Sequence, residues 1–211
     1  MRDRRKEIVA AGYDRLADAY LEWGRNVTAD PRERMLAAFT DRLRDGARVL
    51  DLGCGAGLPS TRDLARRFRV VGVDISPVQI GLARRNVPAA AFIEGDIADV
   101  EFGEATFDGV AALYAISHVP REEHGQLFTD VFRWLVPGGL FLATLGATDA
   151  PDWSGDWLGE PMFFSSHDAD VNRQLLKSAG FELLLHEVLE TSEPGGSVSF
   201  LWVIAQKARL T

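Results

Sequence analysis

Residues 49–57 read VLDLGCGAG and decide the fold of this 211-residue chain. They predict a short buried strand that ends at an acidic residue, followed by a turn with glycine at every second position. Glycine permits positive φ angles and lets a ligand lie against the main chain with no Cβ in the way. We expect a helix over residues 58–68 directly after the turn. Strand, glycine loop and helix N-terminus together are typical of a nucleotide site at the carboxyl ends of parallel strands.

The spacing of these glycines argues against a dinucleotide-binding loop. That fingerprint needs a third small residue, in the pattern Gly-x-Gly-x-x-Gly/Ala, so that the helix can pack on the strand. Counted from Gly53 this position is Leu58, and counted from Gly55 it is Ser60. Neither residue fits, so an NAD-dependent oxidoreductase is the less favoured class of enzyme.

Composition and charge limit the class of protein further. The chain is long enough for one α/β domain, and its net charge of -8 argues against a nucleic-acid partner, which needs a concentrated basic face. Basic residues gather only in residues 2–6, which we interpret as the solvated start of a helix.

The single cysteine, Cys54, excludes an internal disulfide and a cysteine zinc site. Residues 1–12 lack the apolar segment of a signal peptide, and no apolar run is long enough to span a membrane. We therefore expect a cytoplasmic protein without a membrane partner.

Strands and helices alternate from residue 47 onward, which predicts a parallel sheet with helices on both faces. The expected parallel strands are 47–52, 69–74, 90–94, 107–113 and 140–145. Two further strands, 181–190 and 197–206, have no helix between them and should pair antiparallel at the sheet edge. We therefore expect one α/β domain with a doubly wound, mostly parallel, seven-stranded sheet and an antiparallel C-terminal edge hairpin.

The other segments predict a cap and a lid. In residues 1–46, apolar side chains recur on one helix face from Val9 to Trp23, and Asp30-Pro31 is a helix start, so we expect an N-terminal helical cap. Residues 47–211 form the binding and catalytic domain. Within it, residues 146–167 contain two Trp, several Asp and no clean period, and we interpret them as a loop or lid.

Three carboxylates follow the first three strands of the predicted sheet. Asp51, Asp74 and Asp96 should lie together at its carboxyl edge. A carboxylate after the second strand suits a ribose diol, because its oxygens accept both hydroxyl protons. Asp96 can accept from an adenine amine while the backbone N–H of Ile97 serves a ring nitrogen. Each Asp alone has a second interpretation as a turn or cap residue, but three beside a glycine loop indicate an adenosine site.

Seven segments together resemble the class I, Rossmann-like S-adenosylmethionine (SAM)-dependent methyltransferases, in their small-molecule branch. Residues 49–57 resemble motif I, 71–76 the ribose loop, 93–98 motif II and 107–119 motif III; residues 135–142 (LVPGGLFL), 172–187 and 13–20 (YDRLADAY) are similar to the family's fifth strand, the segment after it and its N-terminal cap. The resemblance implies SAM as cofactor, S-adenosylhomocysteine (SAH) as product and no metal.

The resemblance also implies roles for individual residues. Gly53, Gly55 and Gly57 would carry the methionyl part of SAM, Asp51 and the backbone of Leu113 would meet its ammonium group, Asp74 the ribose, Ile75 the adenine face, and Asp96 with Ile97 the adenine edge. Cys54, Gln79 and His118 are further members of the expected cofactor site. Tyr13 and Tyr20 either place hydroxyls near the SAM carboxylate or pack in the helix core.

Catalysis needs little more than positioning, because the donor is already activated. His118 is the first candidate base and His167 the second; both also have structural interpretations, in packing and at a helix start. Trp153, Trp157, Met162 and Phe164 are candidates for an acceptor pocket that favours a planar or hydrophobic molecule. Core packing is the other interpretation of these residues, and it is favoured for Phe163 and Phe164.

The sequence thus predicts transfer of a methyl group to an O, N, S or C atom of a small molecule, with secondary metabolism as one setting. No Asn/Asp-Pro-Pro-Tyr follows the fourth strand, where Leu113-Tyr114-Ala115-Ile116 stands, which disfavours methylation of nucleic-acid adenine. A SAM-binding regulatory or partner subunit without turnover is the alternative. We expect a monomer or a homodimer.

Overall fold

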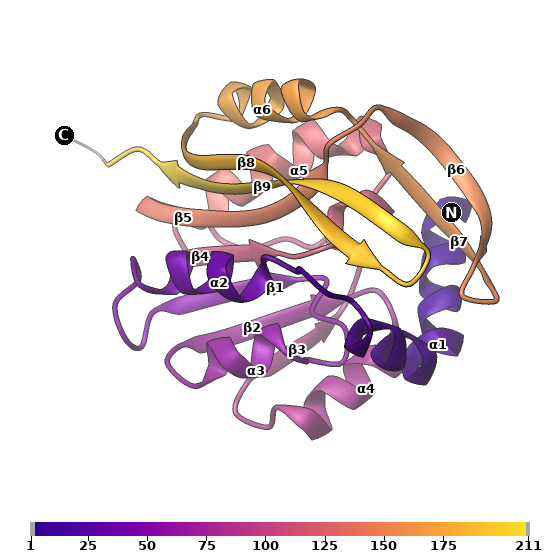
Figure 1. Ribbon diagram of the computed structural model, residues 1–211. Coiled ribbons are helices and arrows are strands. Elements are labelled where there is room, and N and C mark those ends of the chain that lie inside the picture. Colours follow the sequence, from indigo (N-terminus) through magenta and orange to yellow (C-terminus); the bar gives the residue numbers. More distant parts are fainter. Residues whose placement is uncertain (1–2, 210–211) are drawn as a thin grey trace.

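The sheet is organised around β1, as seen in the computed structural model of the chain, which describes residues 3–209 (Figure 1). The strand order is β3-β2-β1-β4-β5-β9-β8. The strands are β1 Arg48–Leu52, β2 Arg69–Asp74, β3 Ala91–Glu94, β4 Phe107–Ala112, β5 Leu135–Gly146, β8 Phe181–Glu193 and β9 Gly196–Lys207. β1 to β5 are parallel, and β9 pairs antiparallel with both β5 and β8. The predicted seven-stranded sheet and its antiparallel edge hairpin are confirmed.

Helices cover both faces of this sheet because its central strands are apolar on both sides. Val49 faces one core with Met35 and Phe39, whereas the next residue, Leu50, faces a second core with Phe128, as the alternation of side chains along a strand requires. The helices are α1 Arg4–Arg25, α2 Arg32–Thr40, α3 Ser60–Ala65, α4 Pro77–Asn86, α5 His124–Trp134 and α6 Ala169–Ser178, with single 3-10 turns η1 Ile116–His118 and η2 Arg121–Glu123. None of the helices within residues 3–209 is long and apolar enough to cross a membrane.

The strand order reverses between β1 and β4, which lie on either side of the point where the chain crosses over. Ligands of open α/β sheets bind outside the carboxyl ends of the strands at such a point. The glycine turn after β1 lies there. The helix that follows it is shorter than expected, because residues 57–59 are still turn and α3 begins only at Ser60.

The segment interpreted as an irregular loop is instead a second, two-stranded sheet. β6 Ala150–Trp157 and β7 Glu160–Ser166 pair antiparallel. β7 buries Met162 and Phe163 against Val9 and Leu16 of α1, and Figure 1 shows the hairpin beside that helix. The Asp, Gly and Pro residues of β6 hide its strand character, which comes from pairing with β7 and not from propensity.

Candidate functional site

The glycine turn has positive φ angles at its three glycines, a conformation that other residues rarely adopt. Gly53, Gly55 and Gly57 have φ angles of 73°, 53° and 78°. The backbone N–H groups of Gly53 and Cys54 both donate to the carbonyl oxygen of Val73, at 2.8 and 3.0 Å, and so fix the turn to β2. A Cβ on Gly53 would lie 2.2 Å from the Cβ of Ala115. The turn therefore passes directly against the end of β4, where no side chain has room.

Asp74 connects this turn to the start of α4. One oxygen of its carboxylate accepts from the Gly55 N–H at 2.8 Å and the other from the Ser76 N–H at 3.0 Å. Burial raises the pKa of Asp74 to about 6, against the opposite effect of these two backbone hydrogen bonds. Each oxygen retains a second acceptor position, which is what a pair of ribose hydroxyls requires.

A cavity of about 80 Å³ lies between this turn and α1; we call it the small cavity. It brings together most of the predicted cofactor residues, namely Tyr13, Tyr20, Gly53, Gly55, Asp74, Ile75, Gln79, Asp96, Ile97, Leu113 and His118. Val9, Tyr114, Ala115 and Val119 also line it and were missed. Val9 lies four residues before Tyr13 on the apolar face of α1, so the helical period could have identified it.

Three predicted cofactor residues do not line the small cavity. Asp51 is buried and accepts from the hydroxyl of Thr61 at 2.6 Å, and burial raises its pKa to about 6, so this carboxyl holds α3. The thiol of Cys54 points to Gly72 of β2, and burial raises its pKa. Gly57 packs on α4, where a Cβ would lie 3.0 Å from Val87.

One buried polar atom of the small cavity fits a ligand with donor groups. The side-chain N–H of Gln79 donates to the Tyr13 carbonyl at 3.4 Å, whereas its Oε1 is buried and has no hydrogen-bond partner within the described residues. This oxygen lies 3.9 Å from where a Cβ of Gly55 would be. A buried acceptor of this kind is costly unless a donor reaches it, and an ammonium or hydroxyl group on a ligand would supply one.

His118 is held as a neutral side chain between two other elements. Its Nδ1 lies 2.9 Å from the Phe163 carbonyl oxygen, which can only accept, so Nδ1 carries the proton. Its Nε2 therefore accepts from the Tyr13 hydroxyl at 2.8 Å. Burial lowers the pKa of His118 to about 4, so the imidazole is uncharged at pH 7 and its lone pair faces Tyr13.

A second cavity of about 1120 Å³ adjoins the small one; we call it the large cavity. Tyr13, Tyr20, Tyr114 and His118 line both cavities and form the wall between them. The predicted pocket residues Trp153, Trp157 and Phe164 also line the large cavity. The rings of Trp157 and Phe164 meet with centroids 5.5 Å apart, and Trp157 lies 5.9 Å from Tyr20.

Two predicted residues lie outside the large cavity. Met162 is fully buried and packs on Gly12 of α1. His167 places Nε2 3.1 Å from the Arg121 carbonyl oxygen, to which it donates, and so holds η2 in place. In this geometry Met162 packs against α1 and His167 holds η2, and the roles of Met162 in the pocket and of His167 as a base stay predictions.

Tyr114, which sequence reasoning missed, is the most constrained residue of the wall. Its φ angle is 59°, which is uncommon for a side chain of this size. Its hydroxyl donates to Asp30 at 2.7 Å, and the Arg32 guanidinium lies 4.8 Å above its ring. Burial is the main cause that raises the pKa of Tyr114, followed by the charge of Asp30. Its partners come from the α1–α2 connection, so no local pattern marks them.

Comparisons with known proteins find a methyltransferase domain within the chain. The sequence model of the methyltransferase domain matches residues 49–139, which hold the glycine turn, Asp74 and Asp96. Residues 49–139 therefore form a methyltransferase domain, and the chain shares its fold with solved SAM-dependent methyltransferases.

Two curated relatives and one solved structure illustrate the similarity. The chain is 34% identical over 116 residues to an uncharacterized methyltransferase of Synechocystis, covering 55% of each chain. It is 36% identical over 140 residues to the 2-phytyl-1,4-naphtoquinone methyltransferase of Thermosynechococcus vestitus, covering 63% of this chain and 59% of the relative. The matches thus span little more than half of these relatives. The 1,6-didemethyltoxoflavin-N1-methyltransferase of Burkholderia thailandensis, solved with SAH, shares the fold with a TM-score of 0.70 and 22% identity over 97% of this chain and 87% of that one.

Proposed function

We propose that this methyltransferase transfers the methyl group of SAM to a small molecule bound in the large cavity. The observation that carries the proposal is the shared wall: Tyr13, Tyr20, Tyr114 and His118 line both cavities. A donor in one cavity and an acceptor in the other would therefore meet at these four side chains.

In this proposal the small cavity marks the cofactor site, and because its volume of about 80 Å³ is less than SAM needs, α1 moves outward as the cofactor binds. The glycine turn passes along the methionyl part, Gln79 Oε1 accepts from a donor of the ligand, and Asp74 accepts from the ribose hydroxyls. Asp96 and Ile97 face the adenine. α1 acts as the N-terminal cap, because Val9, Tyr13 and Tyr20 close the cavity on one side.

When bound, SAM supplies a methyl group on a sulfonium that is already activated for in-line displacement. The protein's contribution is then mainly alignment and exclusion of water. An acceptor group that donates to the Tyr13 oxygen would be linked through the Tyr13 hydroxyl to Nε2 of His118. With a pKa of about 4, His118 is a weak proton acceptor, so this pair contributes orientation more than base strength.

We propose a planar or predominantly hydrophobic acceptor. Trp157, Phe164 and Tyr20 present contacting rings at the end of the large cavity nearest the wall, and aromatic surfaces favour flat partners. The naphtoquinone and didemethyltoxoflavin relatives are named for small-molecule acceptors, which agrees with this proposal.

The test is formation of SAH from SAM with a panel of planar phenols, quinols and heteroaromatic amines. Turnover with at least one panel member, lowered in Trp157→Ala without loss of SAM affinity, supports the proposal. SAM binding with no SAH formed from the panel or from a fractionated metabolite extract would favour the regulatory or partner-subunit alternative.

A further inference from the structure

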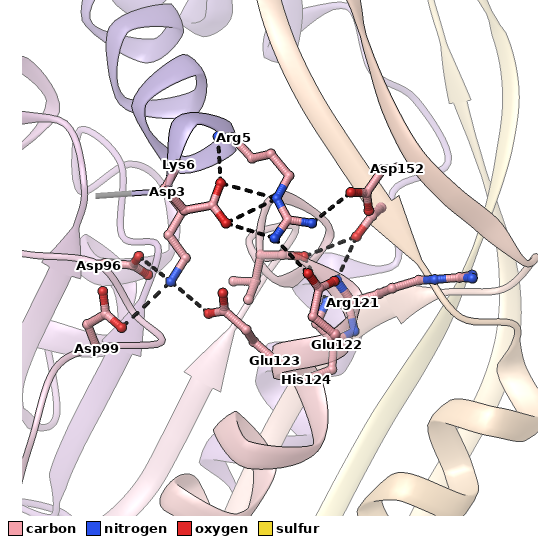
Figure 2. Close-up of polar contacts among 12 residues, drawn as sticks. Asp3, Arg5, Lys6, Asp96, Asp99, Arg121, Glu122, Glu123, His124 and Asp152 are labelled. Carbon is pink, nitrogen blue, oxygen red and sulfur yellow. Dashed lines mark hydrogen bonds and ion pairs between the residues drawn. The ribbon is translucent and has the colours of Figure 1, made fainter. Parts of the chain in front are cut away.

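Lys6 of α1 is buried among three carboxylates. Its Nζ lies 2.6 Å from Glu123, 2.9 Å from Asp96 and 3.6 Å from Asp99 (Figure 2). Only 6% of the residue is exposed. Burial alone would lower the pKa of Lys6, but hydrogen bonds with Glu123 and Asp96 raise it above its usual value, so the amine stays charged. The solvated helix start expected from the sequence is therefore wrong for this residue.

Lys6 reaches Asp96 from outside the small cavity. Asp96 lines that cavity and Lys6 does not. One oxygen of Asp96 accepts from the backbone N–H of Ala98 at 2.9 Å. The other, Oδ2, is buried, forms the ion pair with Lys6, and has no further hydrogen-bond partner within the described residues. A backbone hydrogen bond on one oxygen and an ion pair on the other thus hold the carboxylate, and the buried Oδ2 is an acceptor that a ligand donor would satisfy.

The charges around Asp96 show what Lys6 contributes. Within residues 3–209, Lys6 is the ion-pair partner that Asp96, Asp99 and Glu123 share. Without its charge, Asp96 would have acidic neighbours alone, and repulsion would turn its carboxylate away. That change would remove a fixed acceptor from the small cavity.

We infer that Lys6 is a positioning residue for adenine: it holds Asp96 so that the carboxylate accepts from the exocyclic amine. This inference rests on the proposed function. Lys6, Val9 and Tyr13 are spaced i, i+3 and i+7 and share one face of α1, and the latter two line the same cavity. The contact with Asp96 therefore also seats the cap helix over the adenine end of the site.

Arg5 offers a matched control on the same helix. Its guanidinium lies 2.7 Å from Asp3, 2.6 Å from Glu122 of η2 and 2.7 Å from Asp152 of β6. Figure 2 shows this second cluster beside the first. Arg5 thus ties α1 to η2 and β6 through two ion pairs, with a third to the N-cap residue of its own helix, and makes none with Asp96. Loss of Arg5 loosens the cap without touching the adenine carboxylate.

The experiment compares two probes by calorimetric titration: SAH and S-inosylhomocysteine, in which a carbonyl oxygen replaces the amine. Wild-type protein should bind SAH at least about tenfold more tightly, because the carboxylate meets a donor in one probe and an acceptor in the other. In Lys6→Met this ratio should fall about fivefold or more, and Lys6→Arg should restore part of it. In Arg5→Met both affinities fall together and the ratio stays.

The outcomes separate this inference from the proposed function. Wild-type protein that binds neither probe contradicts the proposed function. Wild-type protein that prefers SAH, together with a folded Lys6→Met that keeps the full ratio, overturns the role of Lys6 alone. Glu123→Gln covers the case in which Lys6→Met does not fold, because it leaves the Lys6–Asp96 pair intact. Its ratio should match or exceed that of the wild type, and a collapse of the ratio in this variant would contradict the inference.

Discussion

The small and large cavities share one wall but are built in different ways. The small cavity is made mostly by turns that directly follow β1, β2, β3 and β4, and backbone N–H groups and carboxylates form its polar surface. The large cavity takes residues from α1, the α1–α2 connection, α2, the segment 58–68 around α3, the β6–β7 hairpin and the β8–β9 hairpin. The first depends on local turn chemistry at strand ends, and the second on how distant segments pack.

The substitution that should disrupt the small cavity most is one that adds a side chain to the glycine turn. Gly53→Ala combines a φ of 73° with a Cβ placed 2.2 Å from Ala115, so we expect a loss of about 3–5 kcal/mol in the free energy of unfolding, measured in urea. Gly46→Ala is the matched control, because it has a φ of 75° and no atom within 4 Å. It should lose only about 1–2 kcal/mol. Equal losses would show that the contact with Ala115 does not matter.

Two buried carboxyls distinguish a residue that binds the cofactor from a residue that only holds the fold. Asp74→Asn should weaken SAH binding about 10–100-fold, because Asp74 lines the cavity and holds Gly55. Asp51→Asn, whose carboxyl is equally buried but contacts Thr61, should change the affinity by less than about threefold. Calorimetry at pH 7.5 measures both. A larger loss in Asp51→Asn would mean that the cofactor reaches Asp51.

The pKa of Asp74 predicts that the affinity for SAH depends on pH. The carboxyl has a pKa of about 6 in the folded protein, and the ribose hydroxyls need its ionised form. SAH affinity should therefore fall as the pH drops through about 6, and Asp74→Asn should give a flat profile. The free energy of unfolding should change with pH in the opposite direction. Between pH 4 and 6 the folded state binds more protons than the unfolded state, so this group lowers stability as the pH rises through that window.

The sequence predicts the part of the site that is built from local turns, and it misses the part that depends on contacts between distant segments. Gly53, Asp74 and Asp96 could be placed because glycine turns and strand-end carboxylates are local. Lys6 and Tyr114 could not, because their partners lie on other segments: Glu123 and Asp96 surround Lys6, and Asp30 is 84 residues from Tyr114. The period of α1, which places Lys6 on the face of Val9 and Tyr13, was the available signal for the first; no local signal existed for the second.

The wall between the cavities can be tested at His118. Its pKa of about 4 lies below that of an unfolded His, so the folded state binds fewer protons between pH 4 and 6.5. The stability that wild type has over His118→Asn should therefore be nearly complete above pH 6.5 and shrink by about 3 kcal/mol as the pH falls to 4. Urea unfolding across this range measures it. A difference that grows toward low pH would mean that the imidazole is charged in the folded protein.

The smallest expected effect is in the large cavity. Trp157→Ala removes a ring that contacts Tyr20 and Phe164, so we expect the KM for the acceptor to rise about fivefold or more, at the low end of the loss for a buried aromatic contact. SAM affinity should stay within about threefold of wild type. Leu158→Ala, at the hairpin tip outside the cavity, should change neither. Loss of SAM affinity in Trp157→Ala alone would show that the two cavities do not divide donor from acceptor.

Calorimetric titration of SAH into the wild-type protein at pH 7.5 tests the central claim most directly. The arrangement of Asp74, Gln79 and Asp96 around one cavity predicts one site per chain with a micromolar Kd, about -8 kcal/mol. No heat of binding at SAH concentrations up to about 1 mM would contradict the assignment of the small cavity to the cofactor.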